Sequence, residues 1–345
     1  MVKGFVKCVC ASLAIFGGLV QADVTLNGAG ASFPKPMYDK FIAEYNRIKP
    51  DVKVNYSSVG SGAGIKQITQ GIVDFGGSDS PMTDAQLAKA TQANGVIFHI
   101  PTVMGAVVPV YNVQGVDKSV NFSGPVLADI FLGKITKWND AKIAEINQGM
   151  NLPDKAITVV HRSDGSGTTA IFTDYLAKVS PEWKSTVGAG TSVKWLATGA
   201  IGGKGNEQVA ANVQNTPGSI GYVELIYALA NKIAYGPVQN KNGKFVIATM
   251  ESVSAAAASL TEVPDDLRMS LTNAEGDDAY PISGLTWLLV YQNQKNAAKG
   301  RALVDFVTWV THDGQALAPA LHYAPLPKKM MTTIDEKLGS IKVAQ

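Results

Sequence analysis

Three clusters of glycine with serine or threonine stand where a short β-branched run ends and an amphipathic pattern begins. They cover residues 28–34, 60–64 and 164–169 of a 345-residue chain. The first turn of a helix has backbone N–H groups without intrahelical partners and carries the positive end of the helix dipole. With a hydroxyl beside those groups, each cluster is typical of a site for an anionic oxygen ligand. For any single cluster, an ordinary N-cap with a flexible turn is the alternative.

Arg162 directly precedes the third cluster. Its planar guanidinium donates two parallel hydrogen bonds, which suits the oxygens of a tetrahedral oxyanion. Asp164, two residues later, is placed to hold this guanidinium in position. We therefore expect the positive charge of an anion site at this turn.

Asp79 is the unexpected member of the set, because a carboxylate repels a bound anion. It lies within the segment Gly-Gly-Ser-Asp-Ser-Pro at residues 76–81. The repulsion disappears only if the ligand carries a proton that the carboxylate can accept. Phosphate carries such a proton at neutral pH and sulfate does not, so Asp79 favours phosphate over sulfate. A helix cap before Pro81 is the alternative.

No catalytic or metal-binding arrangement is evident. The clusters do not fit the dinucleotide-binding pattern G-x-G-x-x-G, since Phe33 and Ile65 replace the third glycine. Ser61 and Ser166 lie in Gly-Ser-Gly rather than in the G-x-S-x-G nucleophile elbow. The histidines are too scattered for a metal site; they are His99, His161, His312 and His322. We expect a binding protein that is not an enzyme and that uses no metal or other cofactor.

The elements that would position these turns alternate between strands and helices, which is typical of an α/β fold with a mainly parallel sheet. The expected strands cover residues 24–27, 52–56, 157–160 and 285–291, and the expected helices cover 34–48, 62–70, 168–178 and 301–311, with another helix capped by Ser123. Residues 103–113 are uncharged and predict a strand buried on both faces, as in a parallel sheet. Ligands usually bind at the carboxyl ends of such strands, where the three clusters would meet.

The composition excludes several classes of protein. The chain is 46% hydrophobic and 17% charged, with 34 glycines and a net charge of +2. This balance argues against collagen, a coiled coil and a disordered chain. A nucleic-acid-binding protein of this size would carry a larger basic excess.

The first 22 residues have the pattern of a secretory signal peptide. Lys3 and Lys7 precede an apolar run, and small residues at Val20 and Ala22 mark a cleavage site near Ala22. A transmembrane anchor is the alternative, but 15 residues between Lys7 and Asp23 are too few for a span. The mature chain would have 323 residues, with 28 acidic and 28 basic side chains and no cysteine.

Six segments closely resemble the periplasmic phosphate-binding proteins of phosphate ABC transporters: residues 28–34, 73–79, 132–138, 162–168, 202–206 and 218–224. The resemblance implies a two-lobed type II periplasmic-binding-protein fold, in which each lobe is a mainly parallel sheet flanked by helices and the ligand cleft lies between the lobes. It further implies a phosphate site made of Ser32, Phe33, Ser61, Asp79, Arg162, Ser166, Gly167 and Thr168.

The resemblance also assigns roles within this site. The counterpart of Asp79 accepts the ligand's proton, and the counterpart of Asp164 pairs with the arginine. Ser32 stands where the family usually has threonine, which keeps the hydroxyl donor. The site residues of the family and those found from the turns therefore agree.

From the resemblance we expect a monomeric, high-affinity periplasmic receptor that captures inorganic phosphate and delivers it to an inner-membrane ABC permease with its cytoplasmic ATPase. Lobe I would comprise residues 23–107 plus 285–345, and lobe II residues 108–284. A secreted phosphatase on the same scaffold and a receptor for another protonated oxyanion, such as arsenate, are the alternatives.

Overall fold

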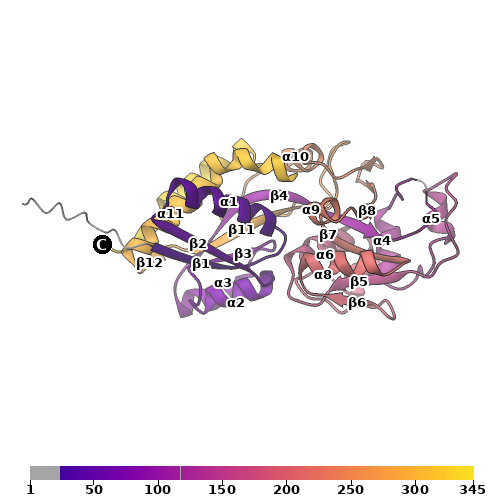
Figure 1. The fold of residues 1–345 in the computed structure, drawn as a ribbon, viewed down its shortest axis with the longest axis horizontal. Coiled ribbons are helices and arrows are strands. Elements are labelled where there is room, and N and C mark those ends of the chain that lie inside the picture. The colour runs from indigo at the N-terminus through magenta and orange to yellow at the C-terminus, as the bar shows by residue number, and fades with distance from the viewer. Residues whose placement is uncertain (1–23, 117) are drawn as a thin grey trace, which may run out of the picture.

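The computed structural model describes residues 24–116 and 118–345, so the predicted signal peptide lies outside the described residues. Two α/β lobes follow one another along the long axis of the molecule (Figure 1). Lobe I contains the beginning and the end of the described chain, and lobe II contains its middle. Within these two described ranges, no helix is long and apolar enough to cross a membrane.

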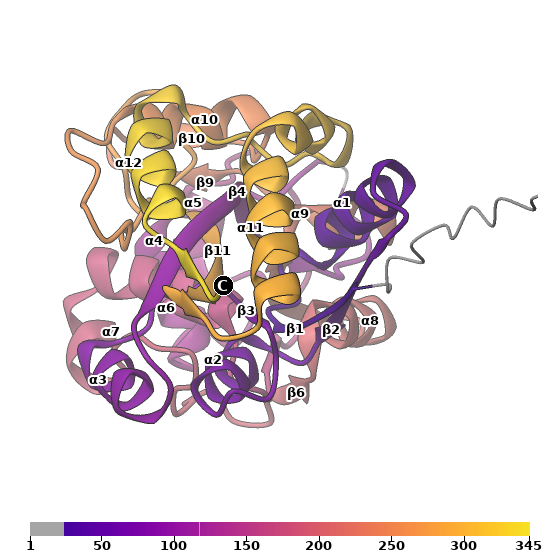
Figure 2. The ribbon, with the colours of Figure 1, turned by 90° about the vertical axis from the view of Figure 1, so that its left-hand side faces the viewer.

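Lobe I is built on four strands in the order β2-β1-β3-β11. Their bounds are β1 (Val24–Gly30), β2 (Val52–Ser58), β3 (Phe75–Ser78) and β11 (Ser283–Tyr291). β1 pairs in parallel with β2 and β3, and β11 runs antiparallel to β3. Helices α1 (Lys35–Ile48) and α11 (Ala297–Thr311) cover one face of the sheet, and α2 (Ser61–Thr69) and α3 (Asp84–Ala93) cover the other (Figures 1 and 2).

Lobe II has a parallel arrangement of β7 (Ser219–Glu224), β5 (Thr158–Arg162) and β6 (Ile201–Gly203). Its helices are α4 (Gly124–Phe131), α5 (Ala141–Glu145), α6 (Gly167–Val179), α7 (Pro181–Thr186), α8 (Gly205–Asn215) and α9 (Leu225–Ala230). Their apolar sides pack on the strands. Phe172 of α6 stacks on Tyr222 of β7 with ring centroids 4.4 Å apart.

The remaining elements of the described residues are short strands, two further helices and a 3-10 helix that packs on α1 and α11 of lobe I. They are β8 (Ala234–Tyr235), β9 (Val238–Gln239), β10 (Phe245–Val246), β12 (Asn293–Gln294), β13 (Lys342–Val343), α10 (Met250–Ala258), the 3-10 helix η1 (Asp313–Leu321) and α12 (Lys328–Gly339). Helices α10 and α12 both contact the long strand β4 (Ile97–Tyr111).

β4 crosses from one lobe to the other. Its residues 97–106 pair with β11 in lobe I, and its residues 107–111 pair with β7 in lobe II. The prediction of a strand buried on both faces is confirmed, since only Phe98 is partly exposed. The prediction of parallel pairing is wrong: β4 runs antiparallel to β11, β7 and β8. The reason is that β11 carries the chain back between the lobes, so the two crossings run side by side in opposite directions.

Most predicted elements are confirmed to within a few residues. The helix expected at 34–48 is α1, which buries Met37, Phe41 and Tyr45 on one face at helical spacing. The expected cap at Ser123 is also confirmed, because its hydroxyl accepts a hydrogen bond from the backbone N–H of Val126. The apolar periodicity and the capping residues of the sequence were sufficient to predict these two helices, α1 and α4.

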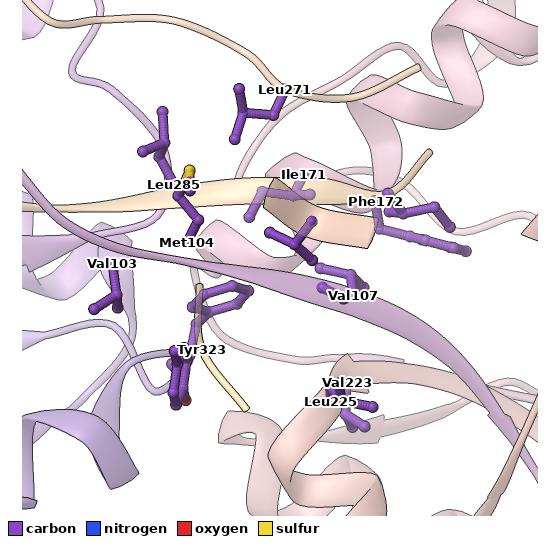
Figure 3. Close-up of a cluster of buried hydrophobic side chains, with 14 of the residues drawn as sticks. Val103, Met104, Val107, Ile171, Phe172, Val223, Leu225, Leu271, Leu285 and Tyr323 are labelled. Atoms are coloured by element: carbon purple, nitrogen blue, oxygen red, sulfur yellow. The ribbon is translucent and has the colours of Figure 1, made fainter. Parts of the chain in front are cut away.

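The apolar core is continuous through the junction between the lobes. Figure 3 shows Val107 of β4 and Leu285 of β11 close to Ile171 and Phe172 of α6. Strand β11 and helix α6 are tightly packed here, because a Cβ added at Gly284 of β11 would lie 2.3 Å from Cδ1 of Ile171 of α6. The start of α6, which carries the third glycine cluster, is thereby packed directly against the crossing strand β11.

Candidate functional site

The three glycine clusters lie at the carboxyl ends of the parallel-paired strands β1, β2 and β5, and each leads into a helix. The second and third clusters touch across the lobes. The backbone N–H of Gly62 donates to the carbonyl of Gly165 at 2.9 Å. Gly60 has a φ of +90°, and a Cβ there would lie 2.3 Å from Oδ2 of Asp164, so only glycine fits. The two glycine clusters that suggested anion sites therefore place the starts of α2 and α6 in contact.

Ser61, at the start of α2, lies between the lobes. Its Oγ accepts hydrogen bonds from the backbone N–H of Gly167, at 3.0 Å, and of Asp79, at 3.2 Å. A hydroxyl oxygen has two lone pairs and one hydrogen, so the hydrogen of Ser61 is left for donation. Oδ2 of Asp79 lies 3.4 Å away. The hydroxyl thus connects the carboxyl group of lobe I to the first turn of α6 in lobe II.

Asp79 is a buried carboxyl group, with 3% of its surface exposed. Burial raises its pKa to about 7, although the hydrogen bond from Thr286 and the charge of Arg162 act in the opposite direction. The Thr286 hydroxyl donates to Oδ1 at 2.8 Å. A carboxyl group with this pKa can hold or accept a proton near neutral pH.

Arg162 is buried and held by Asp164 in a bidentate contact. Its Nε donates to Oδ1 at 2.7 Å and its Nη2 donates to Oδ2 at 2.6 Å. Burial alone would raise the pKa of Asp164, but the hydrogen bonds and charge of Arg162 outweigh it and lower that pKa. The backbone N–H of Gly205 adds a third donor to Oδ1. The guanidinium is therefore fixed in orientation, and its Nη1 points toward Thr168 at 3.4 Å.

The first and third clusters also meet. Ser32 follows β1, Thr168 lies in the first turn of α6, and both hydroxyl oxygens accept hydrogen bonds from the Asn206 side chain. Ser166 is the N-cap of α6, because its Oγ accepts from the backbone N–H of Thr169. Phe33 is fully buried, and its carbonyl accepts from the Tyr323 hydroxyl at 2.6 Å. All eight sequence-predicted contact residues thus lie in or beside the three helix starts.

Sequence reasoning missed two residues that hold the site together, Asn206 and Thr286. Asn206 lies in the segment 202–206 that carried the family resemblance, so its motif was a usable signal. Thr286 lies on β11, 207 positions away from the carboxyl group that it contacts. Only the antiparallel pairing of β11 with β3 brings the two together.

A cavity of about 620 Å³ opens beside Asp79. Ser80 and Trp287 of lobe I line it, as do Ile171 and Asp174 of α6. Of the eight predicted contact residues, all within the described ranges, Asp79 is the one that reaches this cavity. No group of three or more His, Cys, Asp or Glu residues in the described chain could hold a metal ion. The arrangement offers many donors and one proton-accepting carboxyl group, which suits a protonated oxyanion.

Comparison with known proteins relates this chain to one protein-family model and to proteins that are named phosphate-binding proteins. Residues 20–313 match the family model of the PBP superfamily domain. The phosphate-binding protein PstS of Xylella fastidiosa (strain Temecula1 / ATCC 700964) is 47% identical over 314 residues, which cover 90% of this chain and 84% of that protein. PstS of Pasteurella multocida (strain Pm70) is 48% identical over 312 residues, with coverages of 90% and 88%.

A solved structure of a high-affinity periplasmic phosphate-binding protein, bound with phosphate, superposes with a TM-score of 0.75. It covers 91% of this chain and 93% of that one at 24% identity, a likeness that concerns the fold. The predicted type II fold is thereby confirmed. The chain belongs to the PBP superfamily and, within it, to the family of the phosphate-binding proteins.

Proposed function

We propose that the chain is a high-affinity periplasmic receptor that binds inorganic phosphate and delivers it to an inner-membrane ABC permease with its cytoplasmic ATPase. The observation that carries the proposal is the buried Asp79 carboxyl group, which the hydroxyl groups of Ser61 and Thr286 face as hydrogen-bond donors. A site with one proton acceptor and otherwise donors matches an oxyanion that carries one proton. The relatives named phosphate-binding proteins support the same ligand.

The ligand would contact residues from both lobes. Its negative oxygens would accept hydrogen bonds from the Arg162 guanidinium and from hydroxyl and backbone N–H groups, and its proton would bind to Asp79. The full proposed set is Ser32, Phe33, Ser61, Asp79, Arg162, Ser166, Gly167 and Thr168, with Asp164 orienting the arginine. Sulfate would leave two anions face to face at Asp79, which is costly in a buried site.

The proposed lobes are residues 23–107 plus 285–345 for lobe I and 108–284 for lobe II. This division is supported by β4, which changes its pairing partner between Ala106 and Val107, and by β11, which begins at Ser283. We further propose a monomer, exported to the periplasm after cleavage near Ala22. N-terminal sequencing of the exported protein tests the cleavage site.

Titration calorimetry with phosphate, arsenate and sulfate tests the ligand. We expect tight, one-to-one binding of phosphate and of arsenate, which also carries a proton, and no measurable heat with sulfate. Equal affinity for phosphate and sulfate would contradict the role of Asp79. Turnover of a chromogenic phosphate monoester that is lost in Ser166→Ala would support a secreted phosphatase instead.

A further inference from the structure

We propose that Asn206 is a positioning residue that forces the hydroxyl groups of Ser32 and Thr168 to donate their hydrogens to the bound anion. The inference rests on the proposed function of the site. It concerns a residue outside the proposed contact set, which would act through the two hydroxyl groups that its side chain contacts.

The orientation of the Asn206 side chain is fixed by its surroundings. The residue is fully buried in the first turn of α8. The backbone N–H of Glu224 donates to its Oδ1 at 3.0 Å. Because a backbone N–H is a donor only, the oxygen must face Glu224 and the NH₂ group must face the anion site.

Ser32 receives two hydrogen bonds from this one residue. Its Oγ accepts from the backbone N–H of Asn206 at 3.1 Å and from Nδ2 at 2.9 Å. These two bonds occupy both lone pairs of the serine oxygen. The single hydrogen of the hydroxyl must therefore be donated to a third group, and the proposed ligand would be that group.

The hydroxyl group of Thr168 is occupied in the same way, by the other hydrogen of the Asn206 amide and by Arg162. Its Oγ1 accepts from Nδ2 of Asn206 at 3.1 Å and from Nη1 of Arg162 at 3.4 Å. The two hydrogens of the amide are thus divided between one hydroxyl of lobe I and one of lobe II. The same group aligns both hydroxyls and bridges the lobes where the ligand would be enclosed.

This arrangement has a consequence for specificity. Two hydroxyls that can only donate require unprotonated ligand oxygens opposite them, so the ligand's proton is directed to Asp79. An acceptor in place of the amide would reverse the arrangement, because both hydroxyls could then donate to it and turn away from the anion. Asn206→Asp makes this change with almost no change in shape.

The test is a mutant cycle in which phosphate affinity is measured by calorimetry. We expect about tenfold weaker binding for Asn206→Ala and at least about a hundredfold for Asn206→Asp, which adds a negative charge to the site. In a Ser32→Ala/Thr168→Val background, Asn206→Ala should change the affinity less than about threefold, because its two targets are gone. Asn215→Ala is the matched control, because this exposed asparagine lies at the end of the same helix. The phosphate affinity of this variant should equal that of the wild type.

Each outcome is decisive. Equal losses from Asn206→Ala in the wild-type and Ser32→Ala/Thr168→Val backgrounds would overturn the inference, since the residue would then act through packing alone. Wild-type affinity in Asn206→Ala would also overturn it. If thermal unfolding shows that Asn206→Ala does not fold, the uncharged and nearly isosteric Asn206→Leu takes its place in the same cycle, with the same criteria. Failure of the wild-type protein to bind phosphate would instead refute the proposed function.

Discussion

The two lobes contribute opposite chemistry to the site. Lobe I brings hydroxyl groups and a buried carboxyl group, Asp79, whose pKa is raised by burial to about 7. Lobe II brings the buried guanidinium of Arg162 and the first turn of α6. Neither half is a complete site for a protonated oxyanion. We therefore expect lobe II to supply most of the affinity for negative charge and lobe I to supply the choice among anions.

Removal of the cation from lobe II should have the largest effect. Arg162→Ala deletes the positive charge and leaves Asp164 partly buried without its partner, and Asp164 would then repel the anion. A charge-assisted hydrogen bond contributes about 1.5–3 kcal/mol, so two such bonds predict a loss of phosphate affinity of at least about a hundredfold. Calorimetry measures the loss.

Arg268→Ala is the matched control for that variant. Arg268 lines the cavity beside Asp79, but its guanidinium is bound to Asp84 and Asp266. We expect the phosphate affinity of Arg268→Ala to stay within about threefold of the wild type, since surface ion pairs contribute little. If Arg268→Ala lowers the affinity more than Arg162→Ala does, the anion site lies in the cavity and not at the helix starts.

Changing Asp79, the carboxyl group of lobe I, should alter the choice between phosphate and sulfate more than it alters the overall affinity of the site for anions. Asp79→Asn replaces the proton acceptor by an amide that can also donate, so sulfate no longer meets a second anion. We expect weaker phosphate binding and measurable sulfate binding, with the phosphate-to-sulfate affinity ratio reduced by at least about tenfold. An unchanged ratio would show that selectivity arises elsewhere.

The same residue should also make stability depend on pH in the ligand-free protein. The pKa of Asp79 is about 7 in the folded state, above the ordinary value of about 3.9 for an unfolded chain. Its favourable contribution is therefore complete below about pH 4 and is lost as the pH rises to about 7. Asp79→Asn does not titrate, so its unfolding free energy relative to the wild type should increase across this window by about 1.4 kcal/mol per pH unit.

Denaturant unfolding at a series of pH values measures this difference. All other groups titrate in both proteins and cancel in the comparison. A difference that stays flat with pH would mean that the folded protein keeps the Asp79 carboxyl group at an ordinary pKa.

The two lobes also differ in how far the sequence determines their part of the site. Arg162 and Asp164 are neighbours in one turn, and their ion pair follows from local spacing. The α6 cap by Ser166 is local in the same way. In lobe I, Asp79 takes its donor from Thr286 on a strand that returns from the far end of the chain. Local periodicity predicts that strand but not its neighbour or its direction, so this contact could not be found from the sequence.

That long-range donor gives the prediction with the smallest expected effect. Thr286→Val keeps the shape of the side chain but removes the hydrogen bond that lowers the pKa of Asp79. The carboxyl group should then hold its proton to higher pH and must release it before it accepts the proton of the ligand. We expect phosphate affinity at neutral pH to fall by less than about tenfold, since a single hydrogen bond contributes about 0.5–1.5 kcal/mol. The deficit should shrink as the pH rises and the free carboxyl group ionises.

Thr311→Val is the matched control for this variant. Thr311 is also fully buried, and its hydroxyl has Val307, Thr308 and His312 as partners, none of which belongs to the candidate site. Both variants remove a buried hydroxyl group that donates a hydrogen bond, so similar losses of stability are expected from denaturant unfolding. Only Thr286→Val should change phosphate affinity and its pH dependence. Equal affinities in the two variants would mean that Asp79 does not depend on β11, and that lobe I sets its selectivity through the Asp79 turn alone.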